Sequence, residues 1–367
     1  MAEKILFSII SISGGGAERQ MRGILKRLNR AKFAPYLIVF EKPTDKVTIP
    51  NDIEVVVWNS PGHGKLLNFV SMVFWYIKKI REINPDLIVS FLIKMNLLTL
   101  FVGQLILRKE VIISERIYSP YTIKEMPASF FWKTMVRLFY PVAQKITAVS
   151  EDVADGLKNY FKIRRSKIKV INNGVDIEKI NRLSGEYRPY FDSYILACGR
   201  LVPQKNFNVL IQAVSGLDKP LLILGEGPLR DRLRLEAEKN GVKLHMPGYV
   251  DNPYPYFKHA GVFVLSSKYE GFPNVLLEAL ACEVPVVAVS CPGGVNEIIR
   301  PGKNGLLVDS DRPRKMAGAI RKILTDRGLA KKLTGKACKT VSKYSMEDMV
   351  KKYEEIFIKV TQKSNCI

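Results

Sequence analysis

Short apolar segments recur along the chain and are separated by stretches in which apolar residues follow a helical period. In the first half they run continuously instead of alternating with polar residues. These segments are Ile5–Ile10, Tyr36–Phe40, Ile53–Trp58, Asp86–Phe91, Val111–Ser114, Ile146–Val149 and Ile168–Ile171. Continuous apolar runs are typical of strands that are buried on both faces of a parallel sheet. The pattern therefore predicts a series of βα units.

The same pattern starts again after a polar stretch, Asp176–Asp192. Its apolar segments are Tyr194–Cys198, Pro220–Leu224, Val242–His245, Val262–Leu265, Pro285–Val289 and Leu306–Val308. Two successive series in 367 residues predict two Rossmann-like, doubly wound domains of α/β class. We expect the first domain at residues 1–180 and the second at 181–345. Helices are expected at about 327–343 and 346–363, and the last of them is expected to pack on the first domain.

Composition narrows the class of protein. The five cysteines form no CxxC pair, and three histidines are too few for a metal cluster. The longest apolar stretches, Leu66–Ile77 and Leu97–Leu107, are shorter than the roughly 20 residues of a membrane-spanning helix. We therefore expect a cytoplasmic or peripheral protein without a metal. The net charge of +22 is spread over both halves, which favours an anionic partner: a phosphorylated small molecule, nucleic acid or anionic lipid.

Ligands of doubly wound sheets bind outside the carboxyl ends of the strands, so the loops after the strands are candidate sites. Gly14–Arg19 follows the first strand, and its glycines, Gly15 and Gly16 among them, allow a ligand close to the backbone at a helix N-terminus. Arg19 occupies the third glycine position of the dinucleotide fingerprint, so that motif is incomplete. A tight strand-to-helix turn is the alternative.

A second loop, Cys198–Asn206, follows the first strand of the second domain. It holds Arg200 and Lys205, two cations that together suit a diphosphate. A solvated loop without a binding role is the alternative. A third loop, Gly225–Pro228, is a candidate for close ligand approach or only a turn.

The fourth loop contains Glu270 and, eight residues later, Glu278. A helix that starts near Pro273 would offer backbone N–H groups to a phosphate, and Glu278 would accept hydrogen bonds from ribose hydroxyls. Glu270 would reach the sugar or a positively charged transition state. The alternative makes Glu270 a helix cap and Glu278 a surface residue, but Glu278 lies in the apolar segment Val275–Ala281, where an unpaired carboxylate is costly.

Taken together, these segments resemble the retaining glycosyltransferases of family 4, which have the GT-B fold. The matching segments cover nearly the whole chain in the order of the family: Gly15–Glu18, Ala148–Glu151, Asn173–Asp176, Gly199–Asn206, Gly225–Gly227, Ser266–Ala279 and Asn304–Val308. The resemblance implies two domains with an active site between them. It also implies a nucleotide-sugar donor, for which we expect a UDP-sugar, and a hexose or N-acetylhexosamine as the transferred group.

The resemblance also assigns roles to single residues. Arg200 and Lys205 would bind the diphosphate, Glu278 the ribose and Glu270 the transferred sugar. The backbone of Asn274 and Val275 would complete the phosphate site, and the loop around Tyr249 would receive the base. The loops with Gly15, Gly16 and Gly225 would also approach the donor. No cofactor and no metal are implied, because the two cations neutralise the departing diphosphate.

The chain departs from the family pattern at one position. Many relatives have a histidine near the donor sugar, where this chain has Arg116 next to Glu115. Either Arg116 contacts the sugar or phosphate, or the two sequences are offset there. A second segment, Asp309-Ser310-Asp311, has the form of a metal-binding DxD motif, and we interpret it as a solvated loop.

Two helical segments combine aromatic residues with cations, Phe69–Arg81 and Ser129–Lys145. Such segments suit an anionic membrane surface, with core packing as the alternative. Membrane contact would fit a lipid-linked or polysaccharide acceptor at the inner face of the cytoplasmic membrane.

Three other functions compete with glycosyl transfer. A UDP-sugar 2-epimerase would share the fold, but Glu270, Glu278 and the cation pair favour a transferase. Nucleic-acid binding is suggested by charge alone, and no segment resembles a recognition module. A dehydrogenase is disfavoured because neither glycine-rich turn completes the dinucleotide fingerprint.

Overall fold

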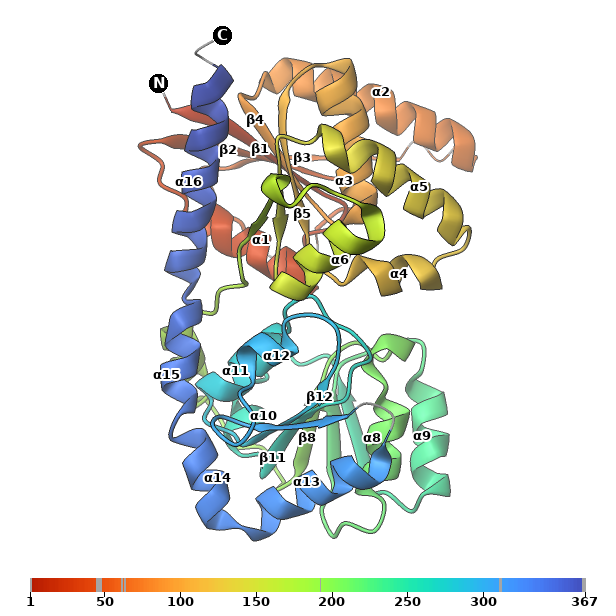
Figure 1. The fold of residues 1–367 in the computed structure, drawn as a ribbon, viewed down its shortest axis with the longest axis vertical. Helices are drawn as coiled ribbons and strands as arrows, with labels where there is room; N and C mark the ends of the chain where they lie inside the picture. The colour runs from red at the N-terminus through yellow and green to blue at the C-terminus, as the bar shows by residue number, and fades with distance from the viewer. Residues whose placement is uncertain are drawn as a thin grey trace. The chain divides into compact units, whose positions relative to one another are not determined.

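The computed structural model describes residues 2–43, 48–60, 62, 64–191, 193–309 and 312–364. Internal contacts divide the chain into two compact units (Figure 1). Unit 1 comprises Met1–Gly174 and Met346–Ile367, and unit 2 comprises Val175–Ser345. The division lies between Gly174 and Val175 instead of at residue 180.

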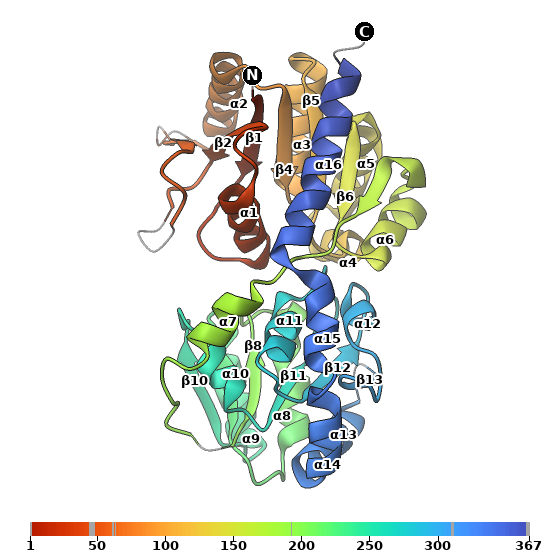
Figure 2. The same cartoon turned by 90° about the vertical axis from the view of Figure 1, so that its left-hand side faces the viewer.

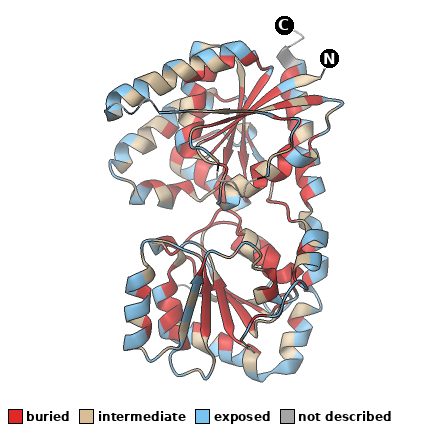
Figure 3. Ribbon diagram, turned by 180° about the vertical axis from the view of Figure 1, so that it is seen from behind, coloured by how far each residue is buried: buried red, intermediate tan, exposed pale blue. Residues whose placement is uncertain are grey.

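Unit 1 is built on a seven-stranded sheet with the order β3-β2-β1-β4-β5-β6-β7. Its strands are β1 (Glu3–Ile9), β2 (Phe33–Val39), β3 (Glu54–Val57), β4 (Leu87–Phe91), β5 (Glu110–Glu115), β6 (Lys145–Ala148) and β7 (Ile168–Val170). All the pairs in this order are parallel. The central strands β1, β4, β5 and β6 are almost entirely buried, which confirms the interpretation of their continuous apolar runs, and Figure 3 shows the buried middle of the sheet. The edge strand β3 is exposed to half-buried, so the interpretation is wrong for the segment Ile53–Trp58.

Helices cover both faces of this sheet (Figures 1 and 2). They are α1 (Gly16–Arg27), α2 (Lys65–Ile83), α3 (Ile93–Thr99), the π-helix η1 (Leu100–Ile106), α4 (Ser119–Glu125), α5 (Ser129–Phe139), the short η2 (Tyr140–Val142), α6 (Glu151–Phe161), η3 (Arg165–Lys167) and α16 (Met346–Ser364). The helix expected at Ser129–Lys145 is shorter than predicted, because the chain tightens into η2 at Pro141 and Lys145 already begins β6.

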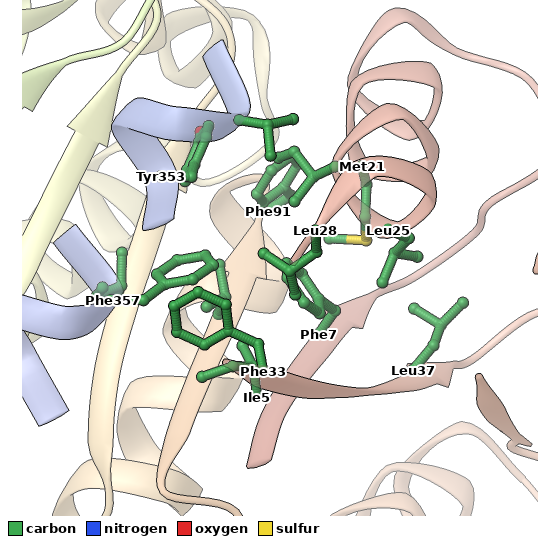
Figure 4. Packing of buried hydrophobic residues seen from close by; sticks show 14 of the residues in the cluster. Ile5, Phe7, Met21, Leu25, Leu28, Phe33, Leu37, Phe91, Tyr353 and Phe357 are labelled. Atoms are coloured by element: carbon green, nitrogen blue, oxygen red, sulfur yellow. The ribbon is translucent and has the colours of Figure 1, made fainter. Parts of the chain in front are cut away.

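The C-terminal helix α16 completes the core of unit 1 (Figure 4). The Phe357 ring packs edge-on against the rings of Phe7 and Phe33, with centroids 6.1 and 5.9 Å apart. Tyr353 stacks on Phe91 at 6.4 Å. The last helix therefore belongs to the first unit because its apolar face fills the core over β1, β2 and β4.

Unit 2 repeats the architecture with a six-stranded parallel sheet, β10-β9-β8-β11-β12-β13. Its strands are β8 (Ile195–Cys198), β9 (Leu221–Leu224), β10 (Leu244–Gly248), β11 (Val262–Leu265), β12 (Val286–Ser290) and β13 (Leu306–Asp309). Its helices are α7 (Ile177–Leu183), η4 (Pro203–Lys205), α8 (Phe207–Val214), α9 (Arg230–Lys239), α10 (Tyr254–Lys258), α11 (Asn274–Ala281), α12 (Val295–Ile298), α13 (Pro313–Thr325), α14 (Arg327–Thr334), α15 (Ala337–Val341) and η5 (Ser342–Tyr344). The single helix expected at 327–343 is interrupted at Gly335 and Lys336, between α14 and α15.

Both sheets reverse their strand order at one point, between β1 and β4 in unit 1 and between β8 and β11 in unit 2. In doubly wound sheets, ligands bind at the carboxyl ends of the strands beside such a reversal. The fold therefore predicts that a ligand site lies at the loops after β1, β4, β8 and β11.

Candidate active site

A buried ion pair spans the reversal point of unit 2. Lys205 lies in the loop after β8 and Glu270 in the loop after β11, and the Lys205 Nζ is 2.6 Å from the Glu270 Oε1. The two side chains are only 15% and 9% exposed. The geometry thus brings together two residues that the sequence analysis had assigned separately to the diphosphate and the sugar.

Neighbouring side chains hold the two loops together. The Ser267 hydroxyl donates a hydrogen bond of 2.6 Å to the same oxygen of Glu270. The Ser266 hydroxyl donates to the carbonyl of Lys205, and the Gln204 amide donates to the carbonyl of Tyr269. The sequence assigns no role to Ser267, which lies in the matching segment Ser266–Ala279, because only the loop conformation directs its hydroxyl at Glu270.

The loop after β9 lies directly against the loop after β8. Gly225 has a φ of +137°, and a Cβ at this position would overlap the carbonyl oxygen of Gly199. Its N–H donates to the carbonyl of Gly248 at the end of β10. Only a glycine permits this conformation and this close approach. Gly225 therefore joins the loops after three strands at one edge of the sheet.

Two further predicted residues line this edge with exposed side chains. Arg200 follows Gly199, and within the described residues its guanidinium makes no hydrogen bond or ion pair. Tyr249 follows β10 and is 60% exposed, with its backbone N–H 3.4 Å from the Glu226 Oε1. Both side chains are thus accessible to a ligand at the carboxyl ends of the strands.

Helix α11 begins at Asn274, one residue later than Pro273, where a helix start was predicted. Pro273 provides no side-chain acceptor for the amides of the first turn, which includes Val275. Glu278 lies farther along α11 and is 4% exposed, so its interpretation as a surface residue is wrong. The carboxylate is held inside unit 2.

In unit 1, Gly15 and Gly16 form the turn from β1 into α1. Gly15 is the residue before the helix, and a Cβ on it would overlap the carboxylate of Glu18. Glu18 in turn interacts electrostatically with Arg116. The glycine turn and Arg116 therefore lie near one another at the carboxyl edge of the first sheet.

Arg116 is almost fully buried, with 7% exposure. Its guanidinium donates hydrogen bonds to the Tyr353 hydroxyl at 3.0 Å and to the Asn173 Oδ1 at 2.6 Å, and it lies over the Phe91 ring at 4.7 Å. Its Nε atom has no partner among the described residues. Tyr353 is 237 residues away in sequence, so no sequence signal links it to Arg116.

Glu115 lies beside Arg116 and is fully buried. Its Oε2 accepts a hydrogen bond of 2.7 Å from Tyr140, while its Oε1 has no partner in the described part of the chain. Burial raises the pKa of Glu115 from 4.5 to about 7, against the opposing effect of the hydrogen bond from Tyr140. The folded protein therefore favours the protonated carboxyl at pH values below about 7.

This buried carboxyl predicts a pH-dependent stability. Because the folded pKa is raised, the folded state binds the proton more tightly, and stability is lost as the pH rises from about 4.5 through 7. A Glu115→Gln variant lacks this loss, so its stability relative to the wild type should rise by about 3 kcal/mol over that range. Denaturant unfolding of both proteins at pH 5 and pH 8 measures the difference between their free energies of unfolding. The same difference at both pH values would contradict the raised pKa.

The DxD-like segment is only partly described. Asp309 forms an exposed ion pair with Lys315, and Ser310 and Asp311 lie outside the described residues. No group of three or more His, Cys, Asp or Glu side chains placed to hold a metal ion occurs in the chain segments described. The same segments contain no helix long and apolar enough to cross a membrane.

Two parallel-sheet α/β units with clustered loops at the carboxyl edges of their sheets define a protein of the GT-B class. Solved structures share this fold. Sucrose-phosphate synthase from Thermosynechococcus elongatus has a TM-score of 0.84 at 17% identity, covering 97% of this chain and 98% of that chain. Anabaena HepE, solved in complex with UDP and glucose, has a TM-score of 0.80 at 22% identity, covering 97% and 99%.

Family comparisons extend this conclusion from the fold to the enzyme. Residues 14–179 match the model "Glycosyltransferase Family 4", and residues 189–340 match "Glycosyl transferases group 1". An N-acetylgalactosamine-N,N'-diacetylbacillosaminyl-diphospho-undecaprenol 4-alpha-N-acetylgalactosaminyltransferase from Campylobacter jejuni is 32% identical over 346 residues, covering 91% of this chain and 94% of the relative. A second alpha-1,4-N-acetyl-D-galactosaminyltransferase from C. jejuni, which acts on a diphospho-undecaprenol-linked glycan, is 25% identical, covering 91% and 92%. The chain belongs to this glycosyltransferase family and is a glycosyltransferase.

Proposed function

We propose that the protein transfers a hexose or N-acetylhexosamine from a nucleotide sugar, with a UDP-sugar as the first candidate, to a lipid-linked or polysaccharide acceptor with retention of anomeric configuration. The observation that carries the proposal is the buried Lys205–Glu270 pair at the reversal point of unit 2, beside the exposed Arg200. A site for a nucleotide sugar needs cations for the diphosphate and an acidic group near the sugar, and this edge of the sheet offers both.

The diphosphate would lie against Lys205 and Arg200. Lys205 presents a point charge, and the guanidinium of Arg200 can contact two phosphate oxygens at once. The first turn of α11, at Asn274 and Val275, adds backbone amides and the positive end of a helix dipole. These groups stabilise the negative charge that develops on the diphosphate when its bond to the sugar breaks.

The remaining predicted residues surround this position. Glu278 on α11 would accept hydrogen bonds from the ribose, and the exposed Tyr249 would contact the base. Gly225 lets the loop after β9 approach the donor without a side chain between them. Glu270 would face the positive charge that develops on the sugar, because its carboxylate is held at the reversal point by Lys205 and Ser267.

The acceptor is inferred from relatives and from the chemistry of unit 1. Two relatives are named as enzymes that act on diphospho-undecaprenol-linked glycans, which supports a lipid-linked acceptor at the inner face of the cytoplasmic membrane. In unit 1 the turn at Gly15 and Gly16 and the cation of Arg116 would then face substrate.

A thermal-stability screen tests the donor site. UDP-, GDP- and ADP-sugars would be added at increasing concentrations, and we expect at least one UDP-sugar to raise the midpoint of unfolding with the logarithm of its concentration. Glu278→Gln should weaken this response about tenfold or more in apparent affinity, because a neutral amide replaces a charged acceptor. No response to any nucleotide sugar, in a protein that unfolds cooperatively, would contradict the proposal.

Transfer should continue in the presence of a chelator. Lys205 and Arg200 already place positive charge at the diphosphate, so a divalent cation has no essential role there. Initial rates of transfer measured with and without EDTA should agree within about twofold. If EDTA abolished transfer and Mg²⁺ or Mn²⁺ restored it, the metal-free mechanism would be wrong and the segment around Asp309 would need a new interpretation.

A further inference from the structure

One side of unit 1 exposes an unusual number of large apolar side chains. We call them the lateral apolar surface. It comprises Leu66, Leu67, Phe69, Val70 and Phe74 of α2, Phe101, Leu105 and Ile106 of η1, and Phe130, Phe131 and Leu138 of α5, each 42–81% exposed. Soluble proteins rarely expose so many in one region, and such regions mark interaction sites.

These residues belong to neighbouring elements of the fold. Helix α2 contacts η1, and α3, which leads into η1, contacts α5 (Figure 1). The Phe101 ring of η1 packs edge-on against the Phe139 ring of α5 at 6.3 Å. The exposed side chains of α2, η1 and α5 therefore lie on elements that pack on one another, directly or through α3, in one part of the unit.

Core packing explains only the inner faces of these helices. In α2, Tyr76 and Ile80 are buried, and Trp75 packs on Trp58 and Phe40. In α5, Val136 is the buried residue, whereas Phe130 is 81% exposed. Core packing, the alternative interpretation of these two segments, therefore accounts for their inner residues and not for their exposed outer ones.

The surroundings of this surface are basic. Residues 65–145 contain twelve lysines and arginines but only five acidic residues. Lys94 lies over the Trp132 ring at 5.9 Å, and Lys133 lies over the Tyr160 ring at 4.3 Å. Arg137 donates to the carbonyl of Tyr160 and Lys145 to that of Ser166. None of these four contacts involves an acidic group, so these four side chains keep their positive charge, whereas Lys78 and Lys79 of α2 pair with Glu82.

We propose that the lateral apolar surface inserts into the interface of a membrane that contains anionic lipid. Apolar and aromatic side chains flanked by cations match a bilayer surface, where apolar groups enter the acyl boundary and cations meet the headgroups. A second copy of the chain is a poorer occupant, since it would bring two basic surfaces together. The inference rests on the proposed function to the extent that a lipid-linked acceptor requires access to a membrane.

Vesicle binding of the full chain tests the proposal. Sedimentation with vesicles of phosphatidylcholine and phosphatidylglycerol should capture the protein, and pure phosphatidylcholine should capture at least about tenfold less. A triple variant, Leu66→Ser, Phe74→Ser and Phe130→Ser, should lower binding to the anionic vesicles by about 100-fold or more, because three inserted side chains are lost. All three side chains are more than 60% exposed, so their replacement leaves the core intact.

A matched control removes equally exposed apolar side chains elsewhere. Tyr190 and Leu235 in unit 2 are 95% and 66% exposed, and Tyr190→Ser with Leu235→Ser should leave vesicle binding unchanged. Replacement of Lys133, Arg137 and Lys145 by Gln should reduce the binding and its sensitivity to salt, since screening acts on the electrostatic part within a Debye length of roughly 10 Å at 0.1 M salt. Equal losses in the control and the triple variant would overturn the assignment of the surface.

Two further measurements test the membrane surface independently of the proposed donor site. Stabilisation by nucleotide sugars should be the same in the triple variant and the wild type, so absent vesicle binding with intact donor binding would overturn only the membrane surface. Sedimentation equilibrium without lipid examines the second-copy alternative. A dimer that the triple variant abolishes, together with no binding to vesicles, would assign the surface to self-association and overturn the membrane proposal.

Discussion

Replacement of Lys205 or Arg200 by alanine is expected to lower turnover about 10²- to 10³-fold with little change in the fold. Each variant removes a preorganised cation from the position where charge develops on the departing diphosphate, and the loss of one such group commonly has an effect of this size. Steady-state kinetics with a saturating acceptor measures the change. Circular dichroism and the unfolding midpoint show whether the variants remain folded.

Lys268 supplies a matched control for these variants. It is an exposed lysine in the same loop as Glu270, and its backbone N–H donates to Gln204. Lys268→Ala removes a cation of the same kind from the same edge of the sheet without removing the buried pair, so turnover should stay within about threefold of the wild type. Near-normal turnover in Lys205→Ala and Arg200→Ala would show that the diphosphate does not bind at this position.

The parallel sheets and the family could be predicted from the sequence. Continuous apolar runs such as Leu87–Phe91 belong to strands buried on both faces, and this pattern does not depend on distant contacts. The loops after the strands were also identifiable, because glycines and cations stand out against apolar neighbours. The helical segment around α5 was placed correctly at its start, but Pro141 and the strand at Lys145 ended it earlier than its periodicity indicated.

Pairings between loops could not be predicted in the same way. Lys205 and Glu270 are 65 residues apart, and they meet because β8 and β11 are neighbours in the sheet although β9 and β10 lie between them in sequence. Arg116 meets Tyr353 because α16 returns to the core of unit 1. Such contacts follow from strand order and from packing of a terminal helix, neither of which leaves a local pattern in the sequence.

Two roles for Glu270 are compatible with its ion pair to Lys205. As a support for Lys205, the carboxylate would matter mainly for donor binding. As a group facing the sugar, it would matter mainly for the chemical step. Glu270 Oε1 accepts hydrogen bonds from both Lys205 and Ser267, so a bound diphosphate would compete with this carboxylate for the ammonium group of Lys205.

Glu270→Gln is therefore expected to lower kcat about 100-fold or more while the dissociation constant of the donor stays the same or falls. The amide oxygen can still accept from Ser267, which keeps the loop in place, but it no longer neutralises Lys205, and the diphosphate then meets an uncompensated cation. Calorimetry with the donor and single-turnover kinetics separate the two quantities. Glu278→Gln, on the neighbouring helix, should show the opposite pattern, with weaker donor binding and a smaller change in kcat. If donor affinity in Glu270→Gln dropped as far as kcat, Glu270 would act as a support for Lys205 and not as a group that stabilises charge on the transferred sugar.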